Sequence, residues 1–202
     1  MRLLRIELPG YTLVNYVSLT YDQKVAVLAM RNDDRVRVRM DNPDPIVLDA
    51  HLAFIEKLRA KDKDYLAIFN DGELIGSVNF EYDGDTAERG VFISPDHGHS
   101  GHAARVLAML NGVMHRYAGI NTIIARVKAD NLPSIKLQGR LGGSMSGSDG
   151  THLHFKYDIA NNNDNMLNIK VITGGGKSSL NLTFPHHRFT VGSHLTQHLM
   201  AC

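Results

Sequence analysis

Cysteine, net charge and long apolar runs are all scarce in this chain of 202 residues, and each scarcity excludes a class of protein. The single cysteine is Cys202, so no intrachain disulfide, cysteine zinc cluster or buried cysteine nucleophile is available. The formal charge of +1 provides no broad field to attract nucleic acid or an anionic membrane. We therefore expect neither as a partner.

Apolar residues make up 43% of the chain, yet no run of them approaches the length of a membrane span. The first residues include Glu7 and Pro9, where a secretory peptide would need an uninterrupted apolar segment. These features predict a cytoplasmic protein. The length is enough for one good core and too short for two ordinary domains.

The spacing of apolar residues predicts an α/β protein of the α+β kind, in which a mixed central sheet contains an antiparallel meander and about four helices flank it. Asp-Gly turns at 71–72 and 83–84 join the three strands of the meander. The expected strands cover residues 11–19, 64–69, 73–82, 86–94, 122–129 and 151–157, and the expected helices cover residues 21–33, 46–61, 103–117 and 131–143.

An asparagine-rich run after Asp158 marks a change in the character of the chain. We expect residues 1–159 to form the main domain and residues 160–202 to form an extension of unknown role. The extension contains the pattern of a hairpin over residues 167–184. Its "GGGKSS" segment is a poor phosphate-binding loop, since Val171 stands where the first glycine would be required.

The segment "ISPDHGHSGHAARVLAML", which begins at Ile93, contains the most specific local signal. A strand ends at a turn rich in glycine and histidine, and a helix begins directly after the turn. Such a turn presents several backbone N–H groups and the positive end of the helix dipole to one point. A phosphate or pyrophosphate is therefore the first hypothesis for its ligand.

The order of elements, with this turn, resembles the acetyl-CoA-dependent N-acetyltransferases of the GCN5-related (GNAT) superfamily. The turn is similar to that family's V-x-P-x-x-[QR]-x-x-G-x-[GA] motif. Ile93, Pro95, Gly101 and Ala103 stand at the matching positions, and Gly98 replaces the basic or amide residue.

A second motif of the family, N-x-x-A-x-x-x-Y-x-K-x-G-F, resembles "NLPSIKLQGRLGG". Gln138 occupies the tyrosine position of this motif, and Gly143 occupies the aromatic position. The resemblance covers roughly residues 12–158. The matching positions of the second motif are Asn131, Ser134, Arg140 and Gly142.

The resemblance implies acetyl-CoA as a co-substrate. We expect no metal, because the histidine clusters have no cysteine or acidic partner at the spacing of a zinc site. In this superfamily the strand that ends near Phe92 and Ile93 splays from its neighbour, and its backbone holds the pantetheine and the thioester. His97 and His99 are either ordinary loop residues or extra polar groups near the CoA phosphates. The donor-binding residues that the resemblance implies are Phe92, Ile93, His97, Gly98, His99, Ser100, Gly101, His102, Ala103, Asn131, Ser134 and Lys136.

Within the superfamily, three segments resemble the enzymes that N-acetylate a UDP-linked 4-amino-4,6-dideoxy sugar during pseudaminic acid synthesis for flagellin and surface glycans. The matching positions are Arg31, Asn32, Met40, His51, Phe54, Ile55, Tyr65 and Gly76. The resemblance implies an apolar pocket of Met40 and Phe54 for the deoxy methyl group, with Arg31 and His51 facing the nucleotide sugar. Asn79 is a further predicted substrate-binding residue.

Residue chemistry is compatible with this acceptor. A 6-deoxy sugar needs an apolar wall, and a UDP diphosphate needs fixed positive charge, which Arg31, Arg35 or Arg37 could supply. Core packing for the two apolar residues and a solvated face for the arginines are the alternatives. A protein or peptide amine as the acceptor, a CoA-binding relative without activity, and a homodimeric assembly also stay open.

Acetyl transfer from a thioester needs a neutral amine, a donor for the oxyanion and a proton for the leaving thiolate. Glu81 and Glu88 are the candidate bases, and His51 is a third. Gln138 occupies the catalytic tyrosine position, although an amide is no useful acid. Because the only cysteine is terminal, we expect direct transfer without an acyl-enzyme.

Overall fold

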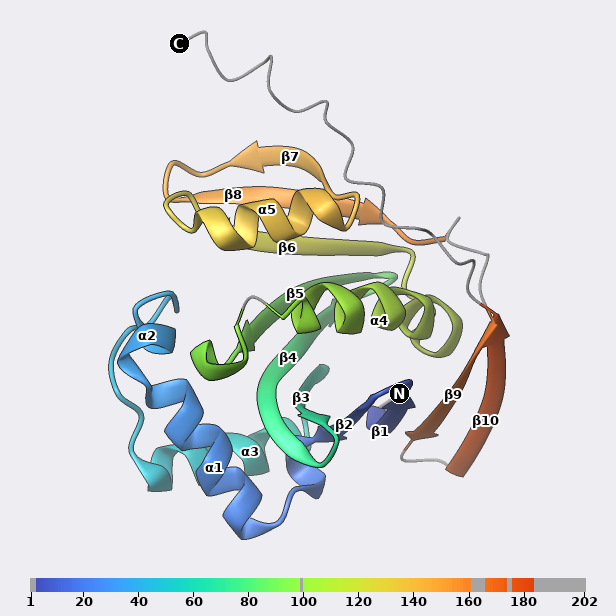
Figure 1. The fold of residues 1–202 in the computed structure, drawn as a ribbon, viewed down its shortest axis with the longest axis horizontal. Coiled ribbons are helices and arrows are strands. Elements are labelled where there is room, and N and C mark those ends of the chain that lie inside the picture. Colours follow the sequence, from blue (N-terminus) through green and yellow to red (C-terminus); the bar gives the residue numbers. More distant parts are fainter. Residues whose placement is uncertain (1–2, 99, 161–165, 174–175, 184–202) are drawn as a thin grey trace, which may run out of the picture.

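The computed structural model describes residues 3–98, 100–160, 166–173 and 176–183, which form one ten-stranded sheet with helices on both faces (Figure 1). The strand order is β10-β9-β1-β2-β3-β4-β5-β6-β8-β7. The strands are β1 (Leu3–Leu8), β2 (Tyr11–Asn15), β3 (Lys63–Asn70), β4 (Glu73–Asp83), β5 (Thr86–Ile93), β6 (Thr122–Lys128), β7 (Ser144–Ser148), β8 (His152–Asp158), β9 (Met166–Thr173) and β10 (Gly176–Thr183).

Five α-helices and two short 3-10 turns accompany the sheet in the described part of the chain. The helices are α1 (Tyr21–Asn32), α2 (Asp34–Arg37), α3 (Leu48–Leu58), α4 (His102–Ala118) and α5 (Leu132–Arg140), and the turns are η1 (Tyr16–Ser18) and η2 (Pro95–His97). The mixed α/β fold expected from the sequence is therefore confirmed, with α2 as an additional short helix.

The meander β3-β4-β5 is antiparallel, as predicted, and its first turn has the expected chemistry. Asp71 and Gly72 both have positive φ, at 49° and 85°. A two-residue hairpin of type I′ needs this conformation at both central positions, because it matches the right-handed twist of the strands. The Asp-Gly pair thus sets the register of β4 against β3.

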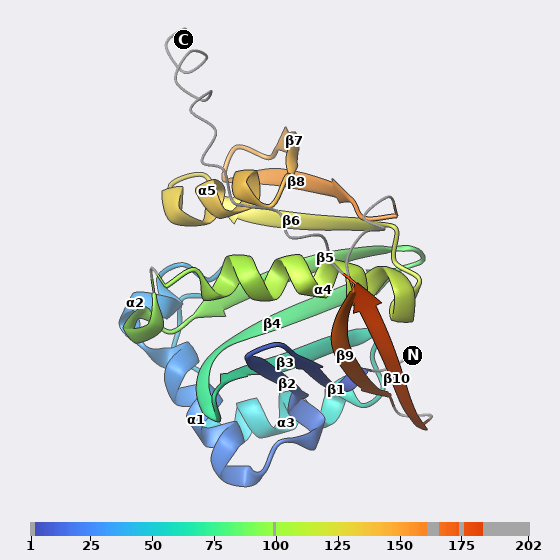
Figure 2. The same ribbon diagram turned by 45° about the vertical axis from the view of Figure 1, so that its right-hand side comes forward.

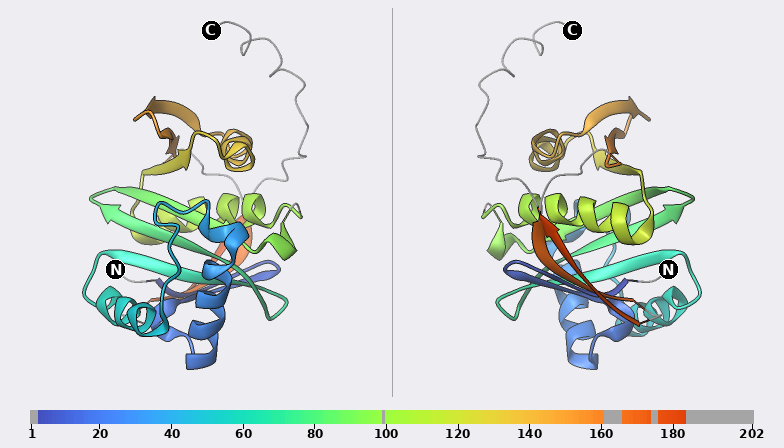
Figure 3. Two further views of the ribbon diagram at one scale, coloured as in Figure 1. Left: turned by 90° about the vertical axis from the view of Figure 1, so that its left-hand side faces the viewer. Right: turned by 90° about the vertical axis from the view of Figure 1, so that its right-hand side faces the viewer.

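The helices divide between the two faces of the sheet, as the side views in Figure 3 show. On one face, α4 and α5 cover the larger core, and the inward residues of α4 follow the helical spacing read from the sequence. On the other face, α1 and α3 cover a smaller core that includes Val27, Ile55 and Leu58. We refer to these as the α4/α5 face and the α1/α3 face.

The parallel neighbours β5 and β6 separate along their length. Their recorded pairs run only from Thr86 with Thr122 to Glu88 with Ile124. Beyond Glu88 the two strands diverge, and the views in Figures 1 and 2 show them opening toward α2. From Arg89 to Ile93, β5 thus has no recorded partner on β6, in agreement with the splay expected near Phe92 and Ile93.

The structure differs from the sequence expectations in three strands. The strand expected over 11–19 ends at Asn15, because the side chain of Asn15 accepts a hydrogen bond from the Val17 N–H (3.2 Å) and begins a 3-10 turn. Strand β1 was missed. Strand β7, "SMSGS", was also missed, since an edge strand pairs on one side only and needs little apolar patterning.

The hairpin expected beyond residue 160 is confirmed as β9 and β10, whose backbones pair antiparallel. Strand β9 also pairs with β1, so the described part of the extension continues the main sheet. The boundary at residues 159 and 160 stays a prediction, because residues 161–165 lie outside the described part.

Candidate active site

The turn between β5 and α4 ends in a helix start that lacks a side-chain cap. Gly101 is the N-cap residue of α4, has a φ of 74° and has open space where a Cβ would stand. The first recorded helical bond runs from the Arg105 N–H to the Gly101 carbonyl, so the preceding N–H groups of the first turn stay available. At the start of a 17-residue helix these groups suit an anion.

The charge on this turn comes from an arginine that the sequence analysis did not single out. The exposed Arg105 lies in the first turn of α4, and its guanidinium donates to the Ser100 carbonyl. His102 bonds to the Tyr11 hydroxyl (2.9 Å), and burial, followed by Arg105 and His97, lowers the pKa of His102 below 6.5. His102 is therefore neutral at pH 7.

Other predicted donor-binding residues of this region already have local contacts. His97 lies 3.3 Å from a Glu73 carboxylate oxygen, and His99 lies outside the described residues. Asn131 caps α5 by accepting from the Ser134 N–H (3.3 Å). Lys136 is exposed on α5.

Gln138, at the tyrosine position of the second motif, is buried in a polar network instead of facing solvent. Its Oε1 accepts from the Tyr157 hydroxyl (2.6 Å) and from Arg89 Nη2 (3.2 Å). Its Nε2 donates to the Ser134 hydroxyl (3.4 Å). Gln138 is 2% exposed, and its amide links three elements, α5, β5 and β8. Neither Arg89 nor Tyr157 was predicted as a site residue.

Arg89 is the centre of this network and is 3% exposed. Its Nη1 donates to the Asn111 side-chain carbonyl on α4 (3.0 Å), and its guanidinium lies 4.9 Å from the centre of the Tyr157 ring. All of these recorded partners are neutral. Burial lowers the pKa of Arg89, and burial raises the pKa of Tyr157 although Arg89 opposes that rise. The sequence signal was an arginine between the inward positions Ala87 and Val91 of an apolar strand.

On the α1/α3 face, the two predicted bases lie directly opposite each other. Glu81 on β4 pairs with Glu88 on β5, and both carboxylates are exposed. Glu81 also forms an ion pair with Lys63 on β3. Glu88 is the last β5 residue paired with β6, so it lies where the strands separate, on the face opposite Arg89.

Aromatic side chains lie on the same face of the sheet. The rings of Phe54 and Tyr65 meet edge to face at 5.0 Å, and Phe54 remains 36% exposed. Asn79, which pairs with Tyr65 on one side and Gly90 on the other, is half-buried. A Cβ on Gly90 would stand 2.5 Å from the Asn79 Oδ1, so this amide occupies space that only a glycine leaves open.

His51 lies beneath this surface and is 5% exposed. Its Nε2 is buried without a recorded hydrogen-bond partner. Burial lowers the pKa of His51, although a hydrogen bond to the Lys24 backbone opposes the shift. The imidazole is therefore neutral at pH 7 and packs edge to face against Tyr16 at 6.1 Å.

The predicted nucleotide-sugar residues near α2 hold the loop that follows it. Arg31 donates to the backbone carbonyls of Asn42 and Asp44, at 2.6 Å and 2.8 Å. The half-buried Met40 lies on this loop, where its carbonyl accepts from Lys128 Nζ at the end of β6 (2.6 Å). Met40 thus contacts Lys128 of β6, whereas Phe54 contacts Tyr65 of β3.

The comparisons with known proteins identify the family. The sequence matches the model of the acetyltransferase (GNAT) domain over residues 17–144. The chain belongs to the GNAT acetyltransferases. It is therefore an acetyl-CoA-dependent N-acetyltransferase, as the two motifs led us to expect. The hypothesis of an enzyme is thus favoured over that of a non-catalytic relative. No curated protein matches the sequence at a significant level.

Solved GNAT structures share the fold at low sequence identity. The chain resembles Campylobacter jejuni N-acetyltransferase PseH in complex with acetyl coenzyme A (TM-score 0.60, 19% identity, 73% of this chain and 98% of that one). It also resembles Vibrio cholerae spermidine N-acetyltransferase in complex with CoA and spermine (TM-score 0.65, 15% identity, 75% and 97%). A third is Mycobacterium smegmatis RimJ in complex with CoA-disulfide (TM-score 0.62, 18% identity, 77% and 86%).

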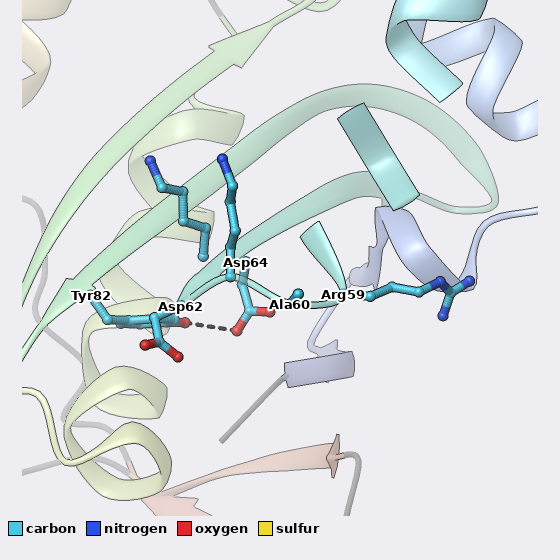
Figure 4. Close-up of a pocket in the computed structure, with 7 residues that line it drawn as sticks. Arg59, Ala60, Asp62, Asp64 and Tyr82 are labelled. Atoms are coloured by element: carbon cyan, nitrogen blue, oxygen red, sulfur yellow. Dashed lines mark hydrogen bonds between the residues drawn. The ribbon is translucent and has the colours of Figure 1, made fainter. Parts of the chain in front are cut away.

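A hollow of about 330 Å³ in this GNAT chain lies outside the predicted site. It surrounds the start of β3, where the Tyr82 hydroxyl donates to Asp64 (2.8 Å), and Figure 4 shows this contact. Its lining consists of Arg59, Ala60, Lys61, Asp62, Lys63, Asp64 and Tyr82. None of these residues was assigned to the donor or the acceptor.

Among the described residues of this GNAT chain, no group of three or more histidine, cysteine, aspartate or glutamate side chains is arranged to hold a metal ion. None of the helices found there has both the length and the apolar character needed to span a bilayer.

Proposed function

We propose that this acetyltransferase acetylates the 4-amino group of a UDP-linked 4-amino-4,6-dideoxy sugar, a building block of pseudaminic-acid-type glycans such as those of modified flagellin. The observation that carries the proposal is the partly exposed pair of Phe54 and Tyr65, which lies beside Asn79 on the face of Glu88. The ring of Phe54 suits a deoxy sugar because it contacts a methyl group and offers no hydroxyl a partner. The similarity in fold to the N-acetyltransferase PseH is consistent with this acceptor.

In this proposal the donor occupies the β5–α4 turn and the splay. The free N–H groups at the start of α4, together with Arg105, would hold the diphosphate of CoA. The unpaired backbone of β5, which ends at Phe92 and Ile93, would hold the pantetheine and thioester. Lys136 is exposed on α5 and could contact the donor, whereas Asn131 and Ser134 would act by fixing that helix.

Glu88 is the base that we favour among the three candidates. It lies where β5 and β6 separate, and no cation is recorded beside it in the described structure. Glu81 already pairs with Lys63, and His51 is buried below the surface. Glu88 would therefore take a proton from the amine as nitrogen attacks the thioester carbon, directly or through one water.

Arg31 is the arginine we assign to the diphosphate of the nucleotide sugar. Its recorded hydrogen-bond partners are neutral backbone carbonyls, and no ion pair is recorded for it in the described structure, although the Asp44 carboxylate acts on its charge. By contrast, Arg35 pairs with Asp33 and Asp96, and Arg37 pairs with Asp34. Their charge is balanced by carboxylates, which leaves less attraction for a phosphate.

The test is a screen of acceptors with acetyl-CoA, in which release of the free thiol is measured. We expect the UDP-linked 4-amino-4,6-dideoxy sugar to have a larger kcat/KM than the matching 6-hydroxy sugar, a peptide with a free amino terminus and spermidine. A larger kcat/KM for the peptide or for spermidine would overturn the proposed acceptor while leaving the acetyltransferase reaction intact.

A protein or peptide amine is the second candidate, and the Glu81–Glu88 pair favours it. Two carboxylates directly opposite each other on an open face attract a cationic acceptor. If this candidate holds, Glu81→Gln should raise KM for the amine and the effect should weaken in high salt. If the acceptor is a sugar whose contacting face is uncharged, Glu81→Gln should change neither KM nor its salt dependence by much.

A further inference from the structure

The buried network of Arg89 has a feature that packing alone does not explain. A guanidinium that is 3% exposed is bonded to two side-chain amides and lies over a phenol ring, and no carboxylate is recorded as its partner in the described structure. A buried charge without a counter-ion is costly, and apolar residues of similar volume would avoid the cost. The arrangement is therefore more useful for a reaction that develops negative charge nearby than for stability.

The location of the network fits such a reaction. Arg89 is the first β5 residue beyond the last pair with β6, so its side chain marks the closed end of the splay on the α4/α5 face. Tyr157 on β8 pairs through the backbone with Ile123, which itself pairs with Ala87 of β5. The phenol thus lies at the same closed end of the splay. A pantetheine chain that lies along the part of β5 without a β6 partner would extend toward this end.

The local sequence is adapted to this phenol. A Cβ on Gly143 would stand 2.5 Å from Tyr157 Cζ and 2.6 Å from its hydroxyl oxygen, so the ring fills the space above the glycine. The hydroxyl lies 2.6 Å from the Gln138 Oε1. The two positions that depart from the second motif, 138 and 143, therefore both contact Tyr157, and a larger residue at 143 would displace the phenol.

We propose that Tyr157 is the general acid of this acetyltransferase and that Arg89 is its positioning residue. As the amine nitrogen bonds to the thioester carbon, the C–S bond breaks and its electron pair passes to sulfur. The Tyr157 hydroxyl gives its proton to that sulfur, which leaves as the free thiol. Arg89 stabilises the phenolate that remains until the phenolate takes up the proton released by the amine.

The test compares two tyrosine-to-phenylalanine variants. Tyr157→Phe removes the proposed acid and keeps the ring over Gly143. Tyr117→Phe is the matched control, because it removes a buried hydroxyl that has no recorded hydrogen-bond partner. The assay follows thiol release from acetyl-CoA with the amine that has the largest kcat/KM in the acceptor screen, so that an error in the proposed sugar does not affect the result.

We expect Tyr157→Phe to lower kcat by about a hundredfold or more, with KM for acetyl-CoA within about threefold of the parent. Tyr117→Phe should match the parent in both. The double variant Tyr157→Phe/Gln138→Tyr places a phenol on the neighbouring helix and should recover at least about tenfold of the lost kcat. A kcat within about threefold of the parent for Tyr157→Phe overturns the proposal. So does a loss that appears mainly in KM or that accompanies a lower thermal midpoint, since either indicates a structural role.

Arg89 supplies a second, independent measurement. Arg89→Lys keeps a positive charge and Arg89→Met removes it, and both fill the buried space. If Arg89 stabilises the phenolate, the methionine variant should lose more kcat than the lysine variant at equal thermal stability. Equal kcat in the two variants would overturn the positioning role.

Discussion

The two faces of the sheet place charge in opposite environments at consecutive residues. On the α4/α5 face, Arg89 is buried among amides and a phenol that come from three other elements. On the α1/α3 face, Glu88 is exposed and lies opposite a second carboxylate. The first environment is fixed by tertiary packing, whereas the second depends on a few exposed side chains. If the donor binds on the first face and the acceptor on the second, as we propose, a family can keep its donor chemistry while its acceptors change.

The largest expected effect is a loss of stability on the α4/α5 face. Gly143→Ala introduces a Cβ 2.5 Å from the Tyr157 ring, and the ring must move within a close-packed core. We expect the free energy of unfolding to fall by about 1–3 kcal/mol, measured by urea denaturation. Gly139→Ala is the control: nothing lies within 4 Å of its Cβ, and α5 should gain about 0.5–1 kcal/mol. Similar behaviour of the two variants would show that position 143 is not tightly packed.

On the α1/α3 face, the change with the largest expected effect is Phe54→Ala. If Phe54 walls the methyl group, a 6-hydroxyl in its place must lose water without a partner, at a cost of about 1–3 kcal/mol. The parent should then prefer the 6-deoxy sugar by roughly ten- to a hundredfold in kcat/KM, and the alanine variant should lose most of that preference. An unchanged preference would return Phe54 to simple packing against Tyr65.

A change at the helix start should be smaller and confined to donor binding. Gly101→Val places a branched side chain at a φ of 74° and hinders approach to the N–H groups of α4. We expect acetyl-CoA to bind at least about tenfold more weakly by calorimetry, or about 1.4 kcal/mol. Gly119, at the other end of α4, has a φ of 68° and the same open space, so Gly119→Val should carry similar strain without weakening binding. Equal losses of affinity would exclude the turn as the donor site.

The smallest effect concerns His51 and pH. Its pKa is lowered in the folded protein, so the unfolded chain binds the proton more readily. Stability from this residue is full above pH 6.5, the ordinary value, and is lost as the pH falls from 6.5 toward the lowered pKa. The thermal midpoint of His51→Phe should therefore fall less than that of the parent between pH 7 and pH 5.5. Some slope should persist, because the pKa of His102 is lowered too. Parallel curves would contradict the buried neutral state.

Much of the fold was predictable because its signals are local. The Asp-Gly turn at 71–72 requires positive φ, the spacing of α4 identifies its buried stripe, and Gly101 marks a helix start. The family match confirms the donor, which two backbone-based motifs had predicted. Such motifs depend on short segments, and a single sequence displays them directly.

The side-chain partners were less predictable, since they come from distant segments. Nothing near Gln138 in the sequence indicates that its amide meets Tyr157 and Arg89. Likewise, the charge of Arg35 is balanced by Asp96, which lies 61 positions away. The sequence displays the charges, but only the folded chain decides which of them remain free to bind a ligand.

The pairing of β1 with β9 affects the order in which the sheet can assemble during synthesis. A ribosome releases β1 early and β9 late, so β1 emerges long before the strand that covers its outer edge. Until then β1 has β2 as its only neighbour and exposes unpaired backbone to other nascent chains. The sheet up to β8 can assemble first, and arrival of the β9–β10 hairpin then covers the outer edge of β1 and makes β10 the edge strand of the sheet.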